Sequence, residues 1–210
     1  MRVAGAIFIG HSNMPEFGLG SHTFNELYGS TFNPYDLSKT PGGSSGGAAV
    51  ALAADLLPLA DGSDLGGSLR NPASFCNVVG FRPSMGRMPF NRGFGWFGRM
   101  VTTGPMAKNV RDAALMFSII AGPDEGDPLT LSEPGITFLD ALTPMDVQEL
   151  NGLRVAFSTD LGSLAIDPEV ALTVRDAAST MESLGAQVVE AEPNLDGAMD
   201  VFQVQRAAGL

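Results

Sequence analysis

The chain has 210 residues, of which 44% are hydrophobic, and its formal net charge at pH 7 is −11. This length suffices for one ordinary domain with a sizeable core. The negative charge argues against nucleic acid or an anionic membrane as a partner, because phosphate groups would be repelled, and no apolar run is long enough to span a bilayer.

Cysteine and histidine are too few and too scattered to build a metal site. The single cysteine, Cys76, excludes an internal disulfide and fits a reducing compartment, so we expect a cytoplasmic protein. Its apolar sequence context predicts a buried, inert thiol rather than a nucleophile. With His11 and His22 as the only histidines, the sequence predicts neither a metal nor another cofactor.

The chain begins with a predicted strand and a predicted loop. Residues 3–10 form a short apolar run after Arg2, which is typical of a buried strand. Residues 16–35 are polar, contain glycine and asparagine and have no clear period, so they predict a loop. We expect His22, within this loop, to be solvated or packed rather than catalytic.

Two glycine–serine turns follow, one at residues 42–47 and the other at residues 64–68. The segment between them is alanine-rich and apolar, and it predicts a buried helix over residues 46–56. Clustered glycines let a backbone approach a ligand closely and point its N–H groups at it. We expect a short strand at residues 57–60 to deliver the second turn, and a further strand at residues 78–82.

Common glycine-rich motifs do not fit the first turn. A phosphate-binding loop has the same glycine spacing but continues with lysine and serine or threonine, whereas Ala48 and Ala49 stand here. The Gly-x-Ser-x-Gly elbow of serine hydrolases takes its base from a histidine downstream of the serine; both histidines lie upstream, so this motif fits only if a segment after residue 210 supplies one. Neither motif explains the pair of turns.

The joint pattern resembles the amidase signature family. The sequence PGGSSGGAA at residues 41–49 looks like the first signature turn of that family, and DGSDLGGSLRNPA at residues 61–73 looks like the second, although threonine is commoner at Ser63. The likeness includes residues 13–17 upstream and TGPMAK at residues 103–108. This long joint pattern is far more specific than any short motif within it.

The resemblance implies a serine–cis-serine–lysine triad. Ser68 would be the nucleophile, and Ser44, joined to Gly43 by a cis peptide, would be the bridging serine in hydrogen-bond reach of it. The family's lysine lies on a strand upstream of the first turn, which we expect to precede residue 1. Lys39 is a weak candidate for a substitute base, because the family often has a basic residue there without a catalytic role.

The resemblance also implies an oxyanion hole in the second turn. The backbone N–H groups of Leu65, Gly66, Gly67 and Ser68 would hold the developing negative charge. In the first turn, Ser45 would support the backbone or contact the substrate.

Two charged residues flank the nucleophile. We expect Asp64 and Arg70 to brace the turns as an ion pair or hydrogen-bond network rather than to react.

The remainder of the chain predicts helices and a βαβ unit. An amphipathic helix is expected at residues 105–121, and a surface connection rich in proline and acids at residues 123–152. A strand at 153–158, a helix from Asp167 to about Leu184 and a strand at 187–191 imply parallel pairing. A further helix begins near the end of the chain.

The implied fold is α/β: a mixed, largely parallel central sheet covered by helices on both faces. We expect residues 1–210 to be part of a single amidase signature domain, incomplete at both ends. Its activity would be hydrolysis of a small-molecule amide through a serine acyl-enzyme, without nucleic acid or membrane as a partner and with a possible homodimer in the full-length form. Two alternatives stay open: the amidase subunit of a tRNA-dependent amidotransferase, and a non-catalytic remnant.

Overall fold

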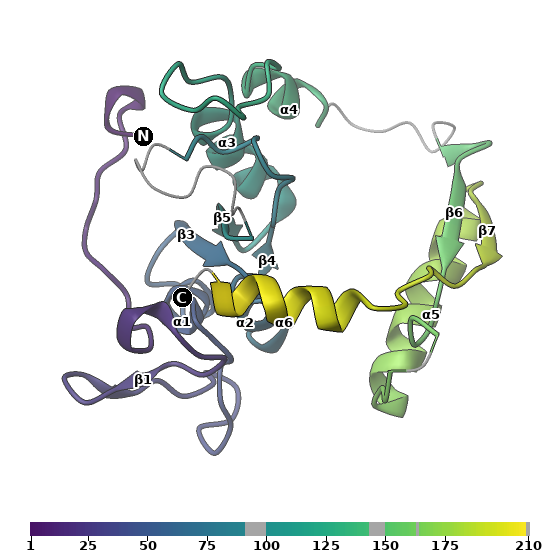
Figure 1. Ribbon diagram of the computed structural model, residues 1–210, viewed down its shortest axis with the longest axis horizontal. Helices are drawn as coiled ribbons and strands as arrows, with labels where there is room; N and C mark the ends of the chain where they lie inside the picture. The colour runs from purple at the N-terminus through teal and green to yellow at the C-terminus, as the bar shows by residue number, and fades with distance from the viewer. Residues whose placement is uncertain (91–99, 143–149, 163, 209–210) are drawn as a thin grey trace. The chain divides into compact units, whose positions relative to one another are not determined.

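The computed structural model describes residues 1–90, 100–142, 150–162 and 164–208 (Figure 1). The chain divides into two compact units, Met1–Leu142 and Thr143–Leu210. Each unit combines helices with a small sheet, so the fold is α/β. No described helix has the length and apolar character needed to cross a membrane.

The first unit is built on a three-stranded sheet in the order β3-β5-β4. The strands are β3 (Leu59–Asp64), β4 (Val79–Gly80) and β5 (Thr102–Ala107), and β5 pairs antiparallel with both neighbours. The register runs from Leu59 opposite Ala107 to Asp64 opposite Thr102. Parallel pairing, which we expected to dominate, is therefore absent from the described strands of this unit.

Small side chains allow the helices to pack closely on this sheet. Helix α1 (Gly46–Ala53) and helix α2 (Arg70–Phe75) both contribute to the core. The buried cluster consists of Ala48, Ala49, Leu52, Leu69, Ala73, Cys76 and Met106. The predicted helix after the first turn is confirmed, although it ends earlier than expected.

The buried thiol of Cys76 is also confirmed. Its Sγ lies 3.8 Å from the carbonyl oxygen of Pro41. Burial raises the pKa of Cys76 to about 11, so the thiol is neutral near pH 7 and a poor nucleophile.

Two further helices, α3 and α4, pack together beyond β5. Helix α3 (Val110–Ile120) is capped by Asn109, whose side chain accepts a hydrogen bond of 2.9 Å from the Asp112 N–H. The ring of Phe117 meets Phe81 at a centroid distance of 5.0 Å and Phe138 of α4 (Ile136–Asp140) at 4.9 Å. These contacts join α4 to the sheet-bearing part of the unit.

The stretch expected to be a surface connection, residues 123–152, has structure of its own. It contains α4, and its Asp127 side chain is 2% exposed and accepts hydrogen bonds from the Phe90 and Leu129 N–H groups at 2.8 and 2.9 Å. Residues 143–149 of this stretch lie outside the described residues. Most described residues of this stretch are exposed, and Asp127 and α4 are among the points where it contacts the rest of the first unit.

The prediction of a buried strand at residues 3–10 is wrong. A short 3-10 helix, η1 (Arg2–Ala4), is followed by irregular backbone, and Val3, Ile7 and Ile9 are 104%, 88% and 72% exposed. Among the described residues no strand pairs with this run, whose backbone hydrogen bonds are local ones to Met1 and Arg2, and most of its apolar side chains stay exposed.

The predicted loop at 16–35 is only partly irregular. It holds a 3-10 turn, η2 (Glu16–Gly18), and a small antiparallel hairpin of β1 (Phe24–Asn25) and β2 (Gly29–Ser30). The Asn25 side-chain oxygen accepts hydrogen bonds from the Leu27 and Tyr28 N–H groups and thereby shapes the hairpin turn. Two residues per strand are too few to produce a readable alternation in the sequence.

The second unit confirms the predicted βαβ arrangement. Strands β6 (Arg154–Phe157) and β7 (Gln187–Glu190) pair in parallel, with α5 (Pro168–Ser183) between them in sequence. Asp167 caps α5 by accepting a hydrogen bond from the Glu169 N–H, as the Asp-Pro signal predicts. The expected last helix is α6 (Ala198–Ala208).

We predict that Gly47→Ala destabilises the first unit. A Cβ at Gly47 would lie 2.4 and 2.5 Å from the backbone oxygen and nitrogen of Asn13, and neither atom can move like a flexible side chain. We expect a loss of about 1–3 kcal/mol in the free energy of unfolding, although alanine is favoured by about 1 kcal/mol inside a helix. Urea denaturation measures this loss. The matched control is Gly10→Ala, where a Cβ would meet nothing within 4 Å; equal effects of the two changes would contradict the packing account.

Candidate active site

The first glycine–serine turn is held by a buried threonine. Thr23 is 2% exposed; its Oγ1 donates to the Gly42 carbonyl at 2.9 Å and accepts from the Gly46 N–H at 3.1 Å. One side chain thus ties the start of the turn to the first residue of α1. Sequence reasoning missed this role, because a threonine in a polar loop carries no signal of such a bridge.

The peptide between Gly43 and Ser44 is cis, as the resemblance implies. A Cβ at Gly43 would lie 2.7–2.9 Å from the backbone of His22, so only glycine fits at this position. Ser44 itself is 2% exposed. The first serine of the turn is therefore buried, and the glycine before it packs against the backbone of His22.

The structure brings the two turns together through Ser45. The Ser45 N–H donates to the Ser68 carbonyl oxygen at 3.0 Å. The Ser45 hydroxyl accepts from the Ser63 N–H at 3.3 Å and lies 3.4 Å from the Ser63 carbonyl, to which it donates. The link is thus a backbone and side-chain clamp by Ser45, and no hydrogen bond between the Ser44 and Ser68 hydroxyls is found among the described residues.

A buried carboxylate organises the second turn. Asp64 is 0% exposed and accepts hydrogen bonds from the Gly67 N–H at 2.8 Å and from the Leu69 and Arg70 N–H groups at 3.3 Å each. The Arg70 guanidinium adds bonds of 2.9 and 3.1 Å. Arg82 Nε lies 3.3 Å from Asp64 Oδ1, close enough for attraction but without hydrogen-bond geometry.

These contacts decide the ionisation of Asp64. Burial alone would raise its pKa, but the hydrogen bonds from Arg70 and the Gly67 N–H outweigh burial, so the pKa of Asp64 lies below its usual value. Asp64 is therefore a carboxylate at neutral pH and only accepts hydrogen bonds. The predicted bracing network of Asp64 and Arg70 is confirmed.

The expected oxyanion donors differ in their surroundings. Gly67 is buried and its N–H is engaged by Asp64, so it could stabilise an oxyanion only by sharing or breaking that bond. Leu65 and Ser68 are half-buried and Gly66 is exposed. Among the described residues no hydrogen bond occupies the N–H groups of Leu65, Gly66 or Ser68, which leaves them available for a ligand.

In the described part of the chain, no lysine or histidine side chain makes a hydrogen bond to Ser44 or Ser68. Lys108 Nζ donates to Asp55 at 2.6 Å, and Lys39 makes no hydrogen bond to Ser44 or Ser68. The exposed His22 ring meets Thr40 Oγ1 through Nδ1 at 3.0 Å. The geometry thus supplies two serines and backbone donors, without a general base beside them in the described part of the chain.

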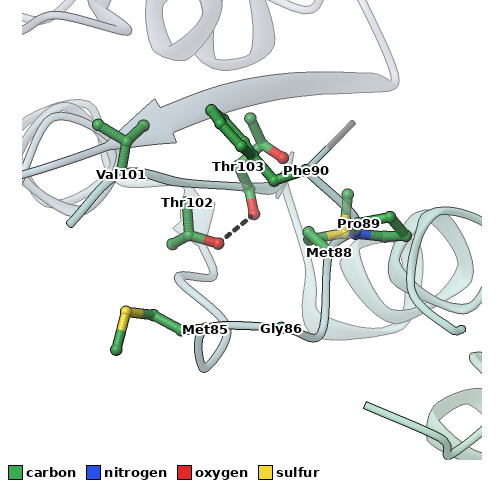
Figure 2. A pocket seen from close by; sticks show the side chains of 8 residues that line it. All are labelled: Met85, Gly86, Met88, Pro89, Phe90, Val101, Thr102 and Thr103. Carbon is green, nitrogen blue, oxygen red and sulfur yellow. Dashed lines mark hydrogen bonds between the residues drawn. The ribbon is translucent and has the colours of Figure 1, made fainter. Parts of the chain in front are cut away.

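A small pocket elsewhere in the first unit is too small for an amide substrate. Figure 2 shows the side chains that line it, among them Met85, Met88, Phe90, Thr102 and Thr103. Its volume of about 10 Å³ is that of one water at most, and it includes neither serine. The two turns remain the candidate site.

We predict that Asp64→Asn lowers stability at pH 7 by about 1–3 kcal/mol, because buried donors lose a charged acceptor. Since the pKa of Asp64 is lower in the folded state, its contribution is present above the unfolded value of about 3.9 and is lost as the pH falls through the folded value. The difference in the free energy of unfolding between wild type and Asp64→Asn should therefore shrink below about pH 4. Urea titrations across pH measure it.

The matched control for this prediction is Asp55→Asn. Asp55 pairs with Lys108 by side chains that are 77% and 45% exposed, so its loss should change stability little. A difference for Asp64→Asn that stays constant down to about pH 2.5, or equal small effects of both changes, would contradict the role given to Asp64.

Known proteins resemble this chain over nearly its whole length. A family model described as Amidase matches residues 1–207. An acylamidase from Rhodococcus erythropolis is 45% identical over 92% of this chain and 40% of the relative. A glutamyl-tRNA(Gln) amidotransferase subunit from Methanospirillum hungatei JF-1 is 38% identical over 97% of this chain and 46% of the relative.

Solved structures give the same result. A bacterial aryl acylamidase described as an amidase signature enzyme has a TM-score of 0.88 and 32% identity, over 99% of this chain and 43% of its own. A glutamyl-tRNA(Gln) amidotransferase subunit from Thermotoga maritima has a TM-score of 0.80 and 32% identity, over 96% and 44%. The chain thus spans less than half the length of these relatives. Because the family model matches almost all 210 residues, the chain belongs to the amidase signature family.

Proposed function

We propose that residues 1–210 are part of a single amidase signature domain that hydrolyses a carboxylic amide through an acyl-enzyme on Ser68. The observation that supports this most strongly is the clamp by which Ser45 bonds to the Ser68 carbonyl, next to the cis Gly43–Ser44 peptide. Two relatives have names that describe this class of reaction, an acylamidase and an aryl acylamidase. Segments outside residues 1–210 would complete a largely parallel central sheet covered by helices on both faces.

In the proposed mechanism, the Ser68 Oγ attacks the carbonyl carbon of the amide. Its proton passes to the Ser44 Oγ, whose own proton moves to a neutral lysine from a segment that precedes residue 1. The tetrahedral intermediate then expels the amine, which takes a proton back along the same path. Water hydrolyses the resulting ester and releases the carboxylic acid and Ser68.

The second turn would stabilise the negative charge of the intermediate. The N–H groups of Leu65, Gly66 and Ser68, which no hydrogen bond of the described residues occupies, are the first donors in this proposal, and Gly67 contributes only if Asp64 shares its hydrogen bond. Loss of one oxyanion donor typically costs about 2.7–4 kcal/mol of transition-state stabilisation. Ser45, in the first turn, fixes the position of the two turns relative to each other through its hydrogen bonds to Ser63 and Ser68.

The proposed setting is a cytoplasmic enzyme that acts on a small-molecule amide, with a possible homodimer in the full-length form. The net charge of −11 supports the absence of nucleic acid and of an anionic membrane from its partners. The two serines and their backbone donors need no metal or other cofactor for this chemistry.

The second candidate is the amidase subunit of a tRNA-dependent amidotransferase. The relatives from Methanospirillum hungatei and Thermotoga maritima, which are named as amidotransferase subunits, favour it. Affinity purification of the tagged protein from its native cells tests this candidate. Co-purification of further amidotransferase subunits in a fixed ratio would support it, and recovery of the protein alone would favour a free-standing amidase.

We predict that residues 1–210 alone hydrolyse an anilide about 10²–10⁴-fold more slowly than a longer form that includes the lysine-bearing strand, because general-base assistance contributes about that much. Release of nitroaniline from nitroacetanilide measures this difference. Hydrolysis of nitrophenyl acetate should decline less, because its leaving group needs little proton transfer. Ser68→Ala should remove both activities from the longer form.

The controls for this prediction separate the sources of turnover. Ser74→Ala changes an exposed serine of α2 outside both turns and should leave the rates unchanged. Fast anilide hydrolysis by residues 1–210 that disappears in Lys39→Ala would contradict the assignment of the base and make Lys39 the substitute. Turnover that survives Ser68→Ala would overturn the proposed nucleophile.

A further inference from the structure

A groove of about 240 Å³ lies beside the first turn, on the side of the segment that supports it. Its lining includes His22, Phe24, Phe32, Lys39 and Thr40. Neither serine of the candidate site lines it, so the groove is distinct from the place where the amide would react. The lining combines aromatic rings, a lysine and hydrogen-bonding groups, which together can hold one small amphipathic molecule.

The charge of the groove is opposite to that of the chain. Lys39 lines the groove in a chain of net charge −11, and no ion pair of the described residues includes it. The nearest acid in sequence is Asp36, whose carboxylate accepts hydrogen bonds from the Ser38 hydroxyl and N–H at 2.7 and 2.9 Å. The hydrogen bonds from Ser38 lower the pKa of Asp36, and the attraction to Lys39 lowers it by a smaller amount. Lys39 is therefore attracted to Asp36 from a distance, but it makes no direct ion pair among the described residues.

Two aromatic side chains of the groove are more than half exposed. Phe24 of β1 is 59% exposed and Phe32 is 52% exposed, whereas phenylalanine side chains are usually buried in a core because of their large apolar surface. A flat apolar ligand that covers both rings would remove this surface from water. The lysine then selects for a negative charge at one end of that ligand.

The floor of the groove is connected to the first turn by hydrogen bonds. Thr40 Oγ1 accepts from the Gly42 N–H at 3.1 Å and contacts His22 Nδ1 at 3.0 Å. The His22 backbone in turn packs against Gly43, the residue before the cis peptide. A ligand at His22 and Thr40 would thus touch the residues that support Ser44.

We propose that this groove is a binding site for a small aromatic carboxylate, with its ring against Phe24 and Phe32 and its carboxylate at Lys39. The site lies outside the two serine turns and does not depend on the Ser68 reaction. Because its wall supports the first turn, occupancy of the groove would stabilise the conformation in which Ser44 is held.

Fluorine NMR with 4-fluorobenzoate tests the proposal on the longest form of the protein that contains residues 1–210. We expect saturable binding with a Kd on the order of 1 mM, as suits a ligand of this size. Lys39→Gln keeps a flexible polar side chain but removes its charge, and should weaken binding about 5–10-fold. Lys39→Arg should retain most of the affinity, and the neutral 4-fluorobenzyl alcohol should bind about as weakly to wild type as 4-fluorobenzoate does to Lys39→Gln.

Control variants keep the test independent of folding and of the proposed reaction. Lys108→Gln removes a lysine that pairs with Asp55 outside the groove and should leave the Kd unchanged. Ser68→Ala should also bind normally, so loss of amidase activity does not imply loss of this site. Circular dichroism establishes that each variant is folded. Equal Kd values for wild type and a folded Lys39→Gln, equal binding of the neutral alcohol, or no saturation up to about 10-fold above the expected Kd would overturn the proposal.

Discussion

The hydrogen bond from the Ser45 N–H to the Ser68 carbonyl is the contact on which the candidate site depends. It joins a turn at the start of α1 to a turn at the end of β3, and the Ser45 hydroxyl repeats the connection at Ser63. A buried side chain also holds each turn by hydrogen bonds: Thr23 holds the first turn and Asp64 holds the second. Because both supports are buried, the relative position of the serine backbones is fixed by the core of the first unit.

Glycine is required where this support comes closest. At Gly43 and Gly47 a Cβ would lie within 3.0 Å of the backbone of His22 or Asn13, and at Gly46 within 3.0 Å of the Thr23 side chain, so the upstream segment packs directly against the backbone of the first turn. The glycines of the motif thus serve the packing of the turn as much as its approach to a ligand. The same packing explains why the groove at His22 and Lys39 is adjacent to the serine turn without sharing its residues.

Local signals in the sequence predicted several elements well. The helix after the first turn follows from its alanine-rich apolar run, and the βαβ unit follows from the Asp167 cap and the alternation on either side of it. The bracing of the second turn by Asp64 and Arg70 was also predictable, because opposite charges flank the serine in a short turn.

Non-local pairing could not be predicted in the same way. Residues 3–10 have the composition of a buried strand, but a strand needs a neighbour, and none of the described residues provides one. The antiparallel order β3-β5-β4 depends on contacts between segments about 26 to 48 residues apart, and the periodicity of a sequence does not show which strands pair. The bridge by Thr23 and the engagement of the Gly67 N–H by Asp64 likewise require coordinates, since residue type alone does not say which hydrogen bond a side chain makes.

The identity of the nucleophile is tested most directly by trapping the acyl-enzyme. A serine-directed fluorophosphonate is incubated with the longest form that contains residues 1–210, and the site of modification is mapped by peptide mass spectrometry. The account predicts one adduct on Ser68, slower labelling in Ser44→Ala and none in Ser68→Ala. An adduct on Ser44 or Ser45 in the wild-type protein, or labelling unchanged by Ser68→Ala, would contradict it.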